Sequence, residues 1–327
     1  MWLVTGATGH IGNVLVRKLL ERGEKVRALI PRGESREPLR GLDVEAMEGN
    51  VLDLDAVFES MRDVRGVFHL AGVISIMPGP NEFVRRVNVD GTKNVLDAAI
   101  ESDVEKVVYA SSIHAIQRVD AAAGVIDESL PYDPNNPYGA YDRSKAEATL
   151  EVLHSARAGL DAVVACPTGV IGPHDYRGSM MGAVIHDAAT ARPTLYVDGA
   201  YDFVDVRDVA EGLIAAAEKG KRGESYILSG NKTSVHDLLE TVRKITGRRF
   251  FKMKIPFDLA KFAALFTPMY YRLAHATPRF TPYSLEVLQS NSNISHAKAT
   301  RELDYRPRTI YETVSDTVKW FLEKKNS

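Results

Sequence analysis

Three glycines spaced three residues apart follow the first apolar segment of this 327-residue chain. Residues 2–5 are Trp-Leu-Val-Thr, the glycines are Gly6, Gly9 and Gly12, and apolar residues then recur at positions 11, 14, 15 and 19 with helical spacing. A strand, a glycine turn and a helix in this order are typical of a loop that binds a dinucleotide pyrophosphate. Glycines let the backbone approach the phosphates, and the helix N-terminus attracts their charge. The alternative is a plain tight turn.

Strand and helix patterns alternate over the first half of the chain. Strands are expected at 2–5, 25–30, 43–48, 66–69, 106–110 and 161–166, with one more at 225–228. This alternation predicts an α/β fold, a Rossmann-type doubly wound parallel sheet with helices on both faces. The pattern is less regular after residue 166. We therefore expect a cofactor-binding domain at 1–166 plus 205–230, and a smaller, mostly helical substrate lobe at 167–204 plus 231–327.

Composition excludes several classes of protein. A net charge of −2 and a pI near 6.5 argue against a nucleic-acid partner. The single cysteine, Cys166, rules out an internal disulfide and favours a cytoplasmic location. No apolar run reaches the ~20 residues needed to span a bilayer. The nearest, residues 257–273, is interpreted as an amphipathic helix of the substrate lobe, with weak membrane contact as the alternative. No histidine or cysteine spacing indicates a metal site.

Tyr141 and Lys145 stand four residues apart in the stretch Tyr-Asp-Arg-Ser-Lys. On a helix this spacing places both side chains on one face, so we expect the ammonium to lie under the phenol. A fixed positive charge there would lower the tyrosine pKa from about 10 toward the range useful for acid–base catalysis. The plain alternative is a surface tyrosine beside a solvated lysine.

The glycine loop and the Tyr141–Lys145 pair together resemble the extended short-chain dehydrogenase/reductase superfamily. The chain looks most like its group of dihydroflavonol reductases, 3β-hydroxysteroid dehydrogenases and hopanoid-associated epimerase-like proteins. Further matching segments lie at 69–72, 88–92, 109–112, 167–173, 203–210 and 298–307. The resemblance implies Ser112, Tyr141 and Lys145 as catalytic residues, with Ser112 binding the substrate oxygen. It also implies a homodimer formed through helices near 91–102 and 140–157.

The same resemblance assigns the cofactor contacts. These are Gly6, Thr8, Gly9, His10, Ile11 and Gly12 in the glycine loop, Asn50 and Val51 beside the adenine, Leu70, Ala71 and Gly72 along the ribose and phosphates, and Asn88 and Pro167 nearer the nicotinamide. Asn50 stands where the family generally has an aspartate, so its contact is less secure. Asn88 has a second interpretation, as a cap for the helix that follows it. Ser111 is expected to bond backbone near the cofactor, and His114 either faces substrate or is structural.

The end of the second expected strand indicates which nicotinamide cofactor is used. NAD-binding folds usually have an acidic residue there, whereas this chain has Pro31-Arg32. A guanidinium suits the 2′-phosphate of NADP(H), with Arg36 as a second contact. The alternatives are NAD(H) as the cofactor and an Arg32 that is merely solvated.

These features predict an NADP(H)-dependent oxidoreductase that interconverts a carbonyl and an alcohol of a small-molecule substrate, with Tyr141 moving the proton. One alternative is a nucleotide-sugar epimerase or dehydratase with tightly bound NAD, and another is a non-catalytic NADP-binding sensor. Several aromatic residues near the C-terminus either line an apolar substrate pocket or, as helical spacing favours, belong to the core. They are Phe257, Phe262, Phe266, Tyr270 and Tyr271.

Overall fold

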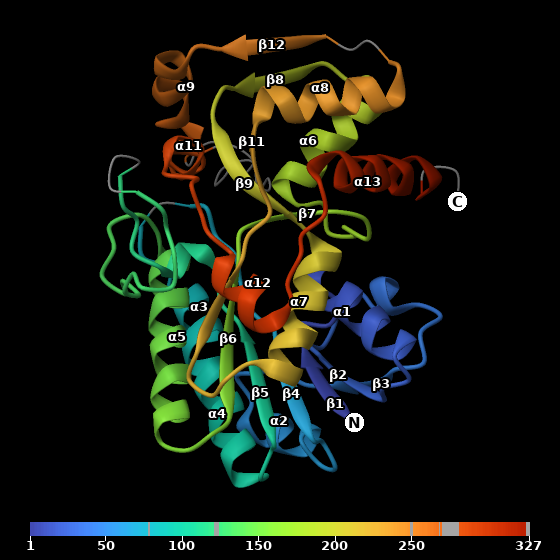
Figure 1. Cartoon of the computed structure of the whole chain (residues 1–327), viewed down its shortest axis with the longest axis vertical. Helices are drawn as coiled ribbons and strands as arrows, with labels where there is room; N and C mark the ends of the chain where they lie inside the picture. The colour runs from blue at the N-terminus through green and yellow to red at the C-terminus, as the bar shows by residue number, and fades with distance from the viewer. Residues whose placement is uncertain (78, 121–123, 249–250, 268, 270–280, 325–327) are drawn as a thin grey trace.

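The computed structural model describes residues 1–77, 79–120, 124–248, 251–267, 269 and 281–324. Its main sheet has seven parallel strands in the order β10-β6-β5-β4-β1-β2-β3 (Figure 1). They are β1 (Trp2–Thr5), β2 (Val26–Ile30), β3 (Glu45–Glu48), β4 (Gly66–His69), β5 (Lys106–Ala110), β6 (Ala162–Pro167) and β10 (Ser225–Leu228). The expected strands and the Rossmann-type sheet are confirmed, with strand bounds within two residues of those expected.

Helices cover both faces of this sheet, and alternation along each strand decides which helices a side chain meets. In β1, Leu3 packs in one core with α2 (Leu54–Ser60), α4 (Gly91–Glu101) and α5 (Ala140–Arg157). Its neighbour Val4 packs in the other core, with α1 (His10–Glu21), α7 (Val206–Lys219) and α12 (Ala297–Leu303). Short helical turns lie at Glu37–Leu39 and Ile113–Ala115, and α3 (Glu82–Arg85) continues through a π-helical turn at Arg86–Asp90 into α4.

Two small sheets lie beyond the carboxyl ends of the main strands, in the upper part of Figure 1. One is formed by β11 (Asn231–Ser234), β9 (Ala200–Asp205) and β7 (Gly169–Ile171), and the other by β12 (Lys252–Ile255) and β8 (Thr194–Val197). The helices around them are α6 (Met180–Ala189), α8 (Val235–Thr246), α9 (Phe257–Ala264), α11 (Pro282–Gln289) and α13 (Ile310–Lys324). The sequence analysis did not predict these five strands, which are too short for clear periodicity. The proposed domain boundaries remain a prediction.

The helix expected across 257–273 is described only in part, as α9. Its core-facing residues are Ala260 and Ala264, which are almost fully buried. Phe257 is partly buried against the same small core, but Phe262 and Phe266 are 62% and 59% exposed. Interpreting these two phenylalanines as core is therefore wrong, because they lie on the opposite side of the helix from the two alanines. Tyr270 and Tyr271 lie outside the described residues. Within the described ranges, no helix is both long and apolar enough to cross a bilayer.

Candidate active site

The glycine loop closes tightly between β1 and α1. Gly6 has a φ of +69°, and a Cβ there would lie 2.7 Å from the Ala71 nitrogen. A Cβ on Gly12 would lie 2.1 Å from the Gly6 carbonyl oxygen, so α1 can start this close to β1 only with glycine. Gly9 precedes α1 and offers no side-chain cap, and the first turn has no acidic residue. The first amides of α1 are thus suited to an anion such as the pyrophosphate of a dinucleotide.

The predicted residues after β4 lie against this loop. Thr5 accepts from the Leu70 amide through its carbonyl oxygen (3.2 Å) and from the Ala71 amide through its side chain (3.1 Å). Gly72 is next to Asn88, whose Oδ1 would lie 3.2 Å from a Cβ at that glycine. These contacts place the predicted ribose- and phosphate-binding segment beside the glycine loop.

Asn88 is buried and connects two elements of the site. Its Oδ1 accepts from the Val73 amide (2.7 Å), and its Nδ2 donates to the Val73 carbonyl (3.0 Å) and to Ser144 Oγ (2.9 Å). The capping interpretation is wrong, because Asn88 lies within a continuous helical segment and its side chain bonds outward. Asn88 instead joins Val73, in the loop after β4, to Ser144 of α5, the residue before Lys145.

The residues predicted to contact the adenine follow β3. Asn50 is exposed, and its Oδ1 accepts from the Leu52 amide at 3.0 Å. Val51 is buried, and a Cβ on Gly91 would lie 2.7 Å from its Cγ2. Pro167 is also buried and is the last residue of β6, a position that the sequence analysis placed just after the strand.

Arg32 lies at the carboxyl end of β2 with its side chain 92% exposed, and its Nε is 4.0 Å from Glu48 Oε1. Two residues that the sequence analysis did not single out lie closer to the glycine loop. Thr8 Oγ1 donates to Glu34 (3.2 Å) and accepts from Arg177 (3.0 Å), and Arg177 and Glu34 form an ion pair.

Arg177 reaches the loop because the segment after β7 packs against it. His10 Nε2 donates to the Pro173 carbonyl oxygen (2.9 Å), and Asn13 Nδ2 donates to the His174 carbonyl oxygen (3.2 Å). No local sequence pattern connects Arg177 with Thr8, since 169 residues separate them.

The three predicted catalytic residues come together at the carboxyl end of β5. Tyr141 and Lys145 lie in the first turns of α5, and Ser112 is the second residue after β5. The Ser112 side chain lies near the Tyr141 phenol and accepts from the His114 amide at 3.2 Å. Ser111 bonds Thr149 Oγ1 on α5 (2.6 Å), so the expectation that it bonds backbone near the cofactor is wrong.

Lys145 is buried and bonds the end of β5 rather than Tyr141. Its Nζ donates to Tyr109 Oη (2.9 Å) and to the Ala110 carbonyl oxygen (2.6 Å), and burial lowers its pKa to about 7. Burial raises the pKa of Tyr141 to about 12, although the nearby Ser112 hydroxyl favours the phenolate. The expected lowering of the Tyr141 pKa by Lys145 is therefore wrong for this arrangement of side chains.

A buried series of hydrogen bonds leads from the glycine loop to Asn88. Thr5 Oγ1 bonds His69 Nδ1 (2.7 Å), and His69 Nε2 bonds Thr92 Oγ1 (2.9 Å). Thr92 donates to the Asn88 carbonyl oxygen (2.6 Å), so it accepts from His69. Burial lowers the pKa of His69 to about 3, which keeps the ring neutral. Every member of this series has a partner, as buried polar groups require.

A second polar cluster lies beside Tyr141. Asp142 is fully buried and accepts from Arg118 (2.7 Å) and from the Tyr283 hydroxyl (2.6 Å). His114 Nε2 hydrogen-bonds the Tyr201 hydroxyl at 2.9 Å, and its ring centroid is 6.3 Å from that of Tyr141. Tyr201 comes from β9 and Tyr283 from α11, so the cluster joins the small sheets and helices to α5. Burial lowers the pKa of His114 to about 4.

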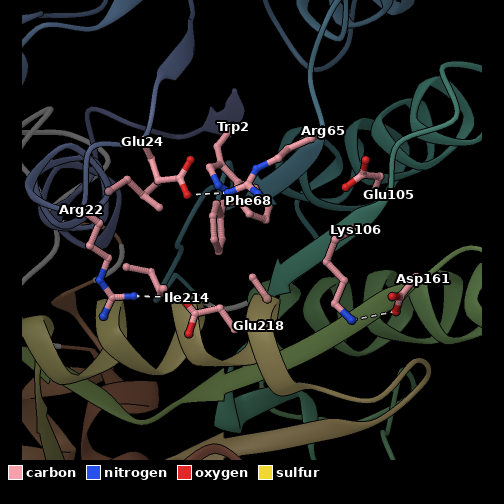
Figure 2. Close-up of a pocket in the computed structure, with 12 residues that line it drawn as sticks. Trp2, Arg22, Glu24, Arg65, Phe68, Glu105, Lys106, Asp161, Ile214 and Glu218 are labelled. Atoms are coloured by element: carbon pink, nitrogen blue, oxygen red, sulfur yellow. Dashed lines mark hydrogen bonds and ion pairs between the residues drawn. The ribbon is translucent and has the colours of Figure 1, made fainter.

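A surface cleft of about 320 Å³ lies at the other end of the main sheet (Figure 2). Trp2 and Lys106 in its wall begin β1 and β5, so this is the amino-terminal edge of the strands. Its charged groups pair with one another, for example Lys106 with Asp161 at 2.8 Å. Ligands of open α/β sheets bind at the carboxyl ends of the strands, and the predicted residues lie at that edge.

Known proteins match the chain over most of its length. The sequence model described as the NAD dependent epimerase/dehydratase family matches residues 2–229. Sterol demethylase protein B of Methylococcus capsulatus is 36% identical over 98% of both chains. A 3β-hydroxysteroid dehydrogenase/Δ5→4-isomerase of Mycobacterium tuberculosis is 28% identical over 99% of this chain and 92% of its own.

Among solved structures, gox2253 superimposes with a TM-score of 0.84 at 33% identity, covering 99% of this chain and 98% of the other. The glycine loop, the strand order and these likenesses agree. The chain belongs to the NAD dependent epimerase/dehydratase family, within the extended short-chain dehydrogenases/reductases.

Proposed function

We propose that the chain is an NADP(H)-dependent oxidoreductase that interconverts a carbonyl and an alcohol. The observation that carries this proposal is the grouping of Ser112 and Tyr141 at the carboxyl end of β5, with Lys145 Nζ buried in the next turn of α5 against Tyr109 Oη and the Ala110 carbonyl oxygen. A bound nicotinamide supplies or accepts the hydride there. The closed glycine loop and the uncapped start of α1 support such a cofactor.

The ionisation of the site favours reduction. With a pKa raised to about 12, Tyr141 keeps its proton at neutral pH and is ready to donate it to the oxygen of a carbonyl that is being reduced. Ser112 has a hydroxyl beside the same phenol and is placed to hydrogen-bond that oxygen. Lys145, whose pKa is lowered by burial to about 7, is about half protonated at pH 7, and its protonated form adds positive charge near the site where negative charge develops in the reaction.

We propose NADP(H) rather than NAD(H) because of the arginine at the end of β2. Arg32 is almost fully exposed, so its guanidinium is available to a 2′-phosphate. Titration with NADPH and NADH tests this, with Arg32→Ala as the variant and Arg62→Ala, at another exposed arginine, as the control. Weaker NADPH binding in Arg32→Ala alone supports the proposal. The proposal is overturned if the wild type binds NADH more tightly than NADPH and Arg32→Ala leaves that binding unchanged.

The relatives suggest a substrate with an apolar ring system. Two of them are named for sterols and 3β-hydroxysteroids, at 36% and 28% identity. Tyr201 and Tyr283 are buried, with their hydroxyls engaged by His114 and Asp142, so the relatives alone support this substrate class. We therefore place ketosteroids and sterol ketones first among candidate substrates.

The second candidate function is a nucleotide-sugar epimerase or dehydratase, which the matching family name supports. Such an enzyme returns the hydride to its own substrate and retains its NAD. Purified protein that holds tightly bound NAD and turns over a nucleotide sugar without net cofactor oxidation would replace our proposal. A non-catalytic sensor would bind NADPH and leave every substrate unchanged.

The central experiment is a screen of NADPH oxidation with ketosteroids, aldehydes, flavonoids and nucleotide sugars. Tyr141→Phe should abolish turnover while NADPH binding stays near the wild-type level. Tyr311→Phe, at an exposed tyrosine of α13, is the control and should leave turnover unchanged. Turnover retained in Tyr141→Phe would remove Tyr141 from the proton-transfer role.

We also propose a homodimer formed through α4 and α5. Ile100 on α4 and Leu150 on α5 are 48% and 38% exposed, and α4 packs beside α5. Light scattering of the wild type and of Ile100→Glu/Leu150→Glu tests this, and a wild-type monomer would contradict it.

A further inference from the structure

The outer end of the molecule formed by β8, β12 and α9 has a strongly apolar surface, which we call the α9 face. Fifteen large apolar side chains are exposed in the described part of the chain. Eight of them belong to this end, one on β8 and seven between residues 251 and 269. Figure 1 shows β12 and α9 at the extremity farthest from the main sheet.

The two-stranded sheet continues this surface beyond the helix. Leu195 lies opposite Met253, and Val197 lies opposite Ile255. Because side chains alternate along a strand, all four point to the same face. Val197 and Ile255 pack with α9, whereas Leu195 and Met253 are 58% and 48% exposed. The apolar surface therefore extends from beneath α9 onto open sheet.

α9 itself is apolar on two sides. Ala260 and Ala264 pack inward. Leu259 and Phe262, with Phe266 just after the helix, follow an i, i+3, i+7 pattern on the outward side and are 58%, 62% and 59% exposed. The rings of Phe262 and Phe266 meet edge to face with centroids 5.4 Å apart. Helices that are apolar on all sides are normally covered, so an outward pair of phenylalanines indicates a binding surface.

The charge around the α9 face identifies the occupant. The described residues between 243 and 267 include six Lys and Arg and a single acidic residue, Asp258, in a chain whose net charge is −2. Two of the six, Arg243 and Lys252, pair with Glu240. Lys261 is exposed beside Phe262, and Lys254 is exposed on β12, where it pairs with Asp198 at 2.7 Å. A second copy of this chain would place like charges against one another, whereas anionic lipid attracts clustered basic residues next to an apolar helix face.

We infer that the α9 face docks on an anionic lipid surface. Phe262 and Phe266 enter the boundary between headgroups and acyl chains, and the surrounding basic side chains bind lipid phosphates. This attachment is peripheral, since it uses one face of a short helix. It does not depend on the proposed oxidoreductase activity.

Co-sedimentation with vesicles tests the inference. One set of vesicles contains equal parts phosphatidylglycerol and phosphatidylcholine, and the other contains phosphatidylcholine alone. The wild type should bind the anionic vesicles about tenfold more tightly or better, and added salt should weaken that binding. Phe262→Ser/Phe266→Ser and Lys254→Glu/Lys261→Glu should each lower binding to anionic vesicles about tenfold or more.

The matched control is Phe83→Ser/Tyr311→Ser, which removes two aromatic side chains that are 60% and 56% exposed elsewhere. It should bind vesicles like the wild type. Circular dichroism and the thermal midpoint check that each variant is folded. The inference is overturned if the wild type fails to bind anionic vesicles, if the control loses binding equally, or if the α9 variants bind normally. It is also overturned if those variants instead dissociate a dimer in light scattering.

Discussion

Lys145 should make folding stability rise between pH 7 and pH 9, and Lys145→Met should remove that contribution. Burial lowers the pKa of Lys145 to about 7 in the folded chain, whereas an unfolded lysine titrates near 10.4. Between these values the unfolded chain keeps a proton that the folded chain has released, so a higher pH favours the folded state. Proton linkage at Lys145 therefore adds about 2 kcal/mol to the free energy of unfolding between pH 7 and pH 9. Methionine does not titrate, so Lys145→Met lacks this gain.

Urea unfolding of the wild type and of Lys145→Met at pH 7 and pH 9 measures this contribution. The difference in the free energy of unfolding between the two proteins is compared at the two pH values, so that the contributions of other titrating groups cancel. Loss of the hydrogen bonds to Tyr109 and Ala110 adds an offset that does not depend on pH. Lys261→Met, at an exposed lysine, is the control and should follow the wild type at every pH. The reasoning is refuted if the difference between wild type and Lys145→Met changes by less than about 0.5 kcal/mol, the precision of such extrapolations.

Three other substitutions test the surroundings of the site. The folded pKa of His114 is lowered to about 4 and an unfolded histidine titrates near 6.5, so stability is complete above pH 6.5 and falls by about 3 kcal/mol toward pH 4. His114→Gln should therefore unfold at lower pH than the wild type by circular dichroism, and equal midpoints would contradict this. Gly12→Ala should lower the free energy of unfolding by about 2–3 kcal/mol and abolish NADPH binding in fluorescence titration, because the Cβ meets the Gly6 carbonyl oxygen. Normal NADPH binding would show that the loop is not the pyrophosphate site. Tyr283→Phe should cost about 1.5–3 kcal/mol in urea unfolding, since buried Asp142 loses a donor, and a neutral effect would mean that Arg118 alone satisfies the carboxylate.

Local patterns in the sequence were sufficient for the main sheet and for the neighbourhood of the site. Alternation along β1 and the glycines after it depend only on nearby residues, which is why both could be predicted. Tyr141, Lys145 and Ser112 were brought together as expected because each lies in a segment whose place in this type of sheet is fixed. The short strands of the two small sheets were missed, since three to six residues give too little periodicity.

Only the tertiary structure decided where the side chains point. Lys145 shares a helix face with Tyr141, yet its long side chain bonds Tyr109 and Ala110. A buried amino group needs hydrogen-bond partners, and the end of β5 provides two acceptors. Arg177 meets the glycine loop across 169 residues of chain, and Phe262 is exposed because two alanines form the core side of α9. Spacing along the chain determines the elements and their faces. Hydrogen-bond partners and side-chain exposure depend on which distant segments of the chain meet in the fold. Local sequence patterns do not show which segments these are.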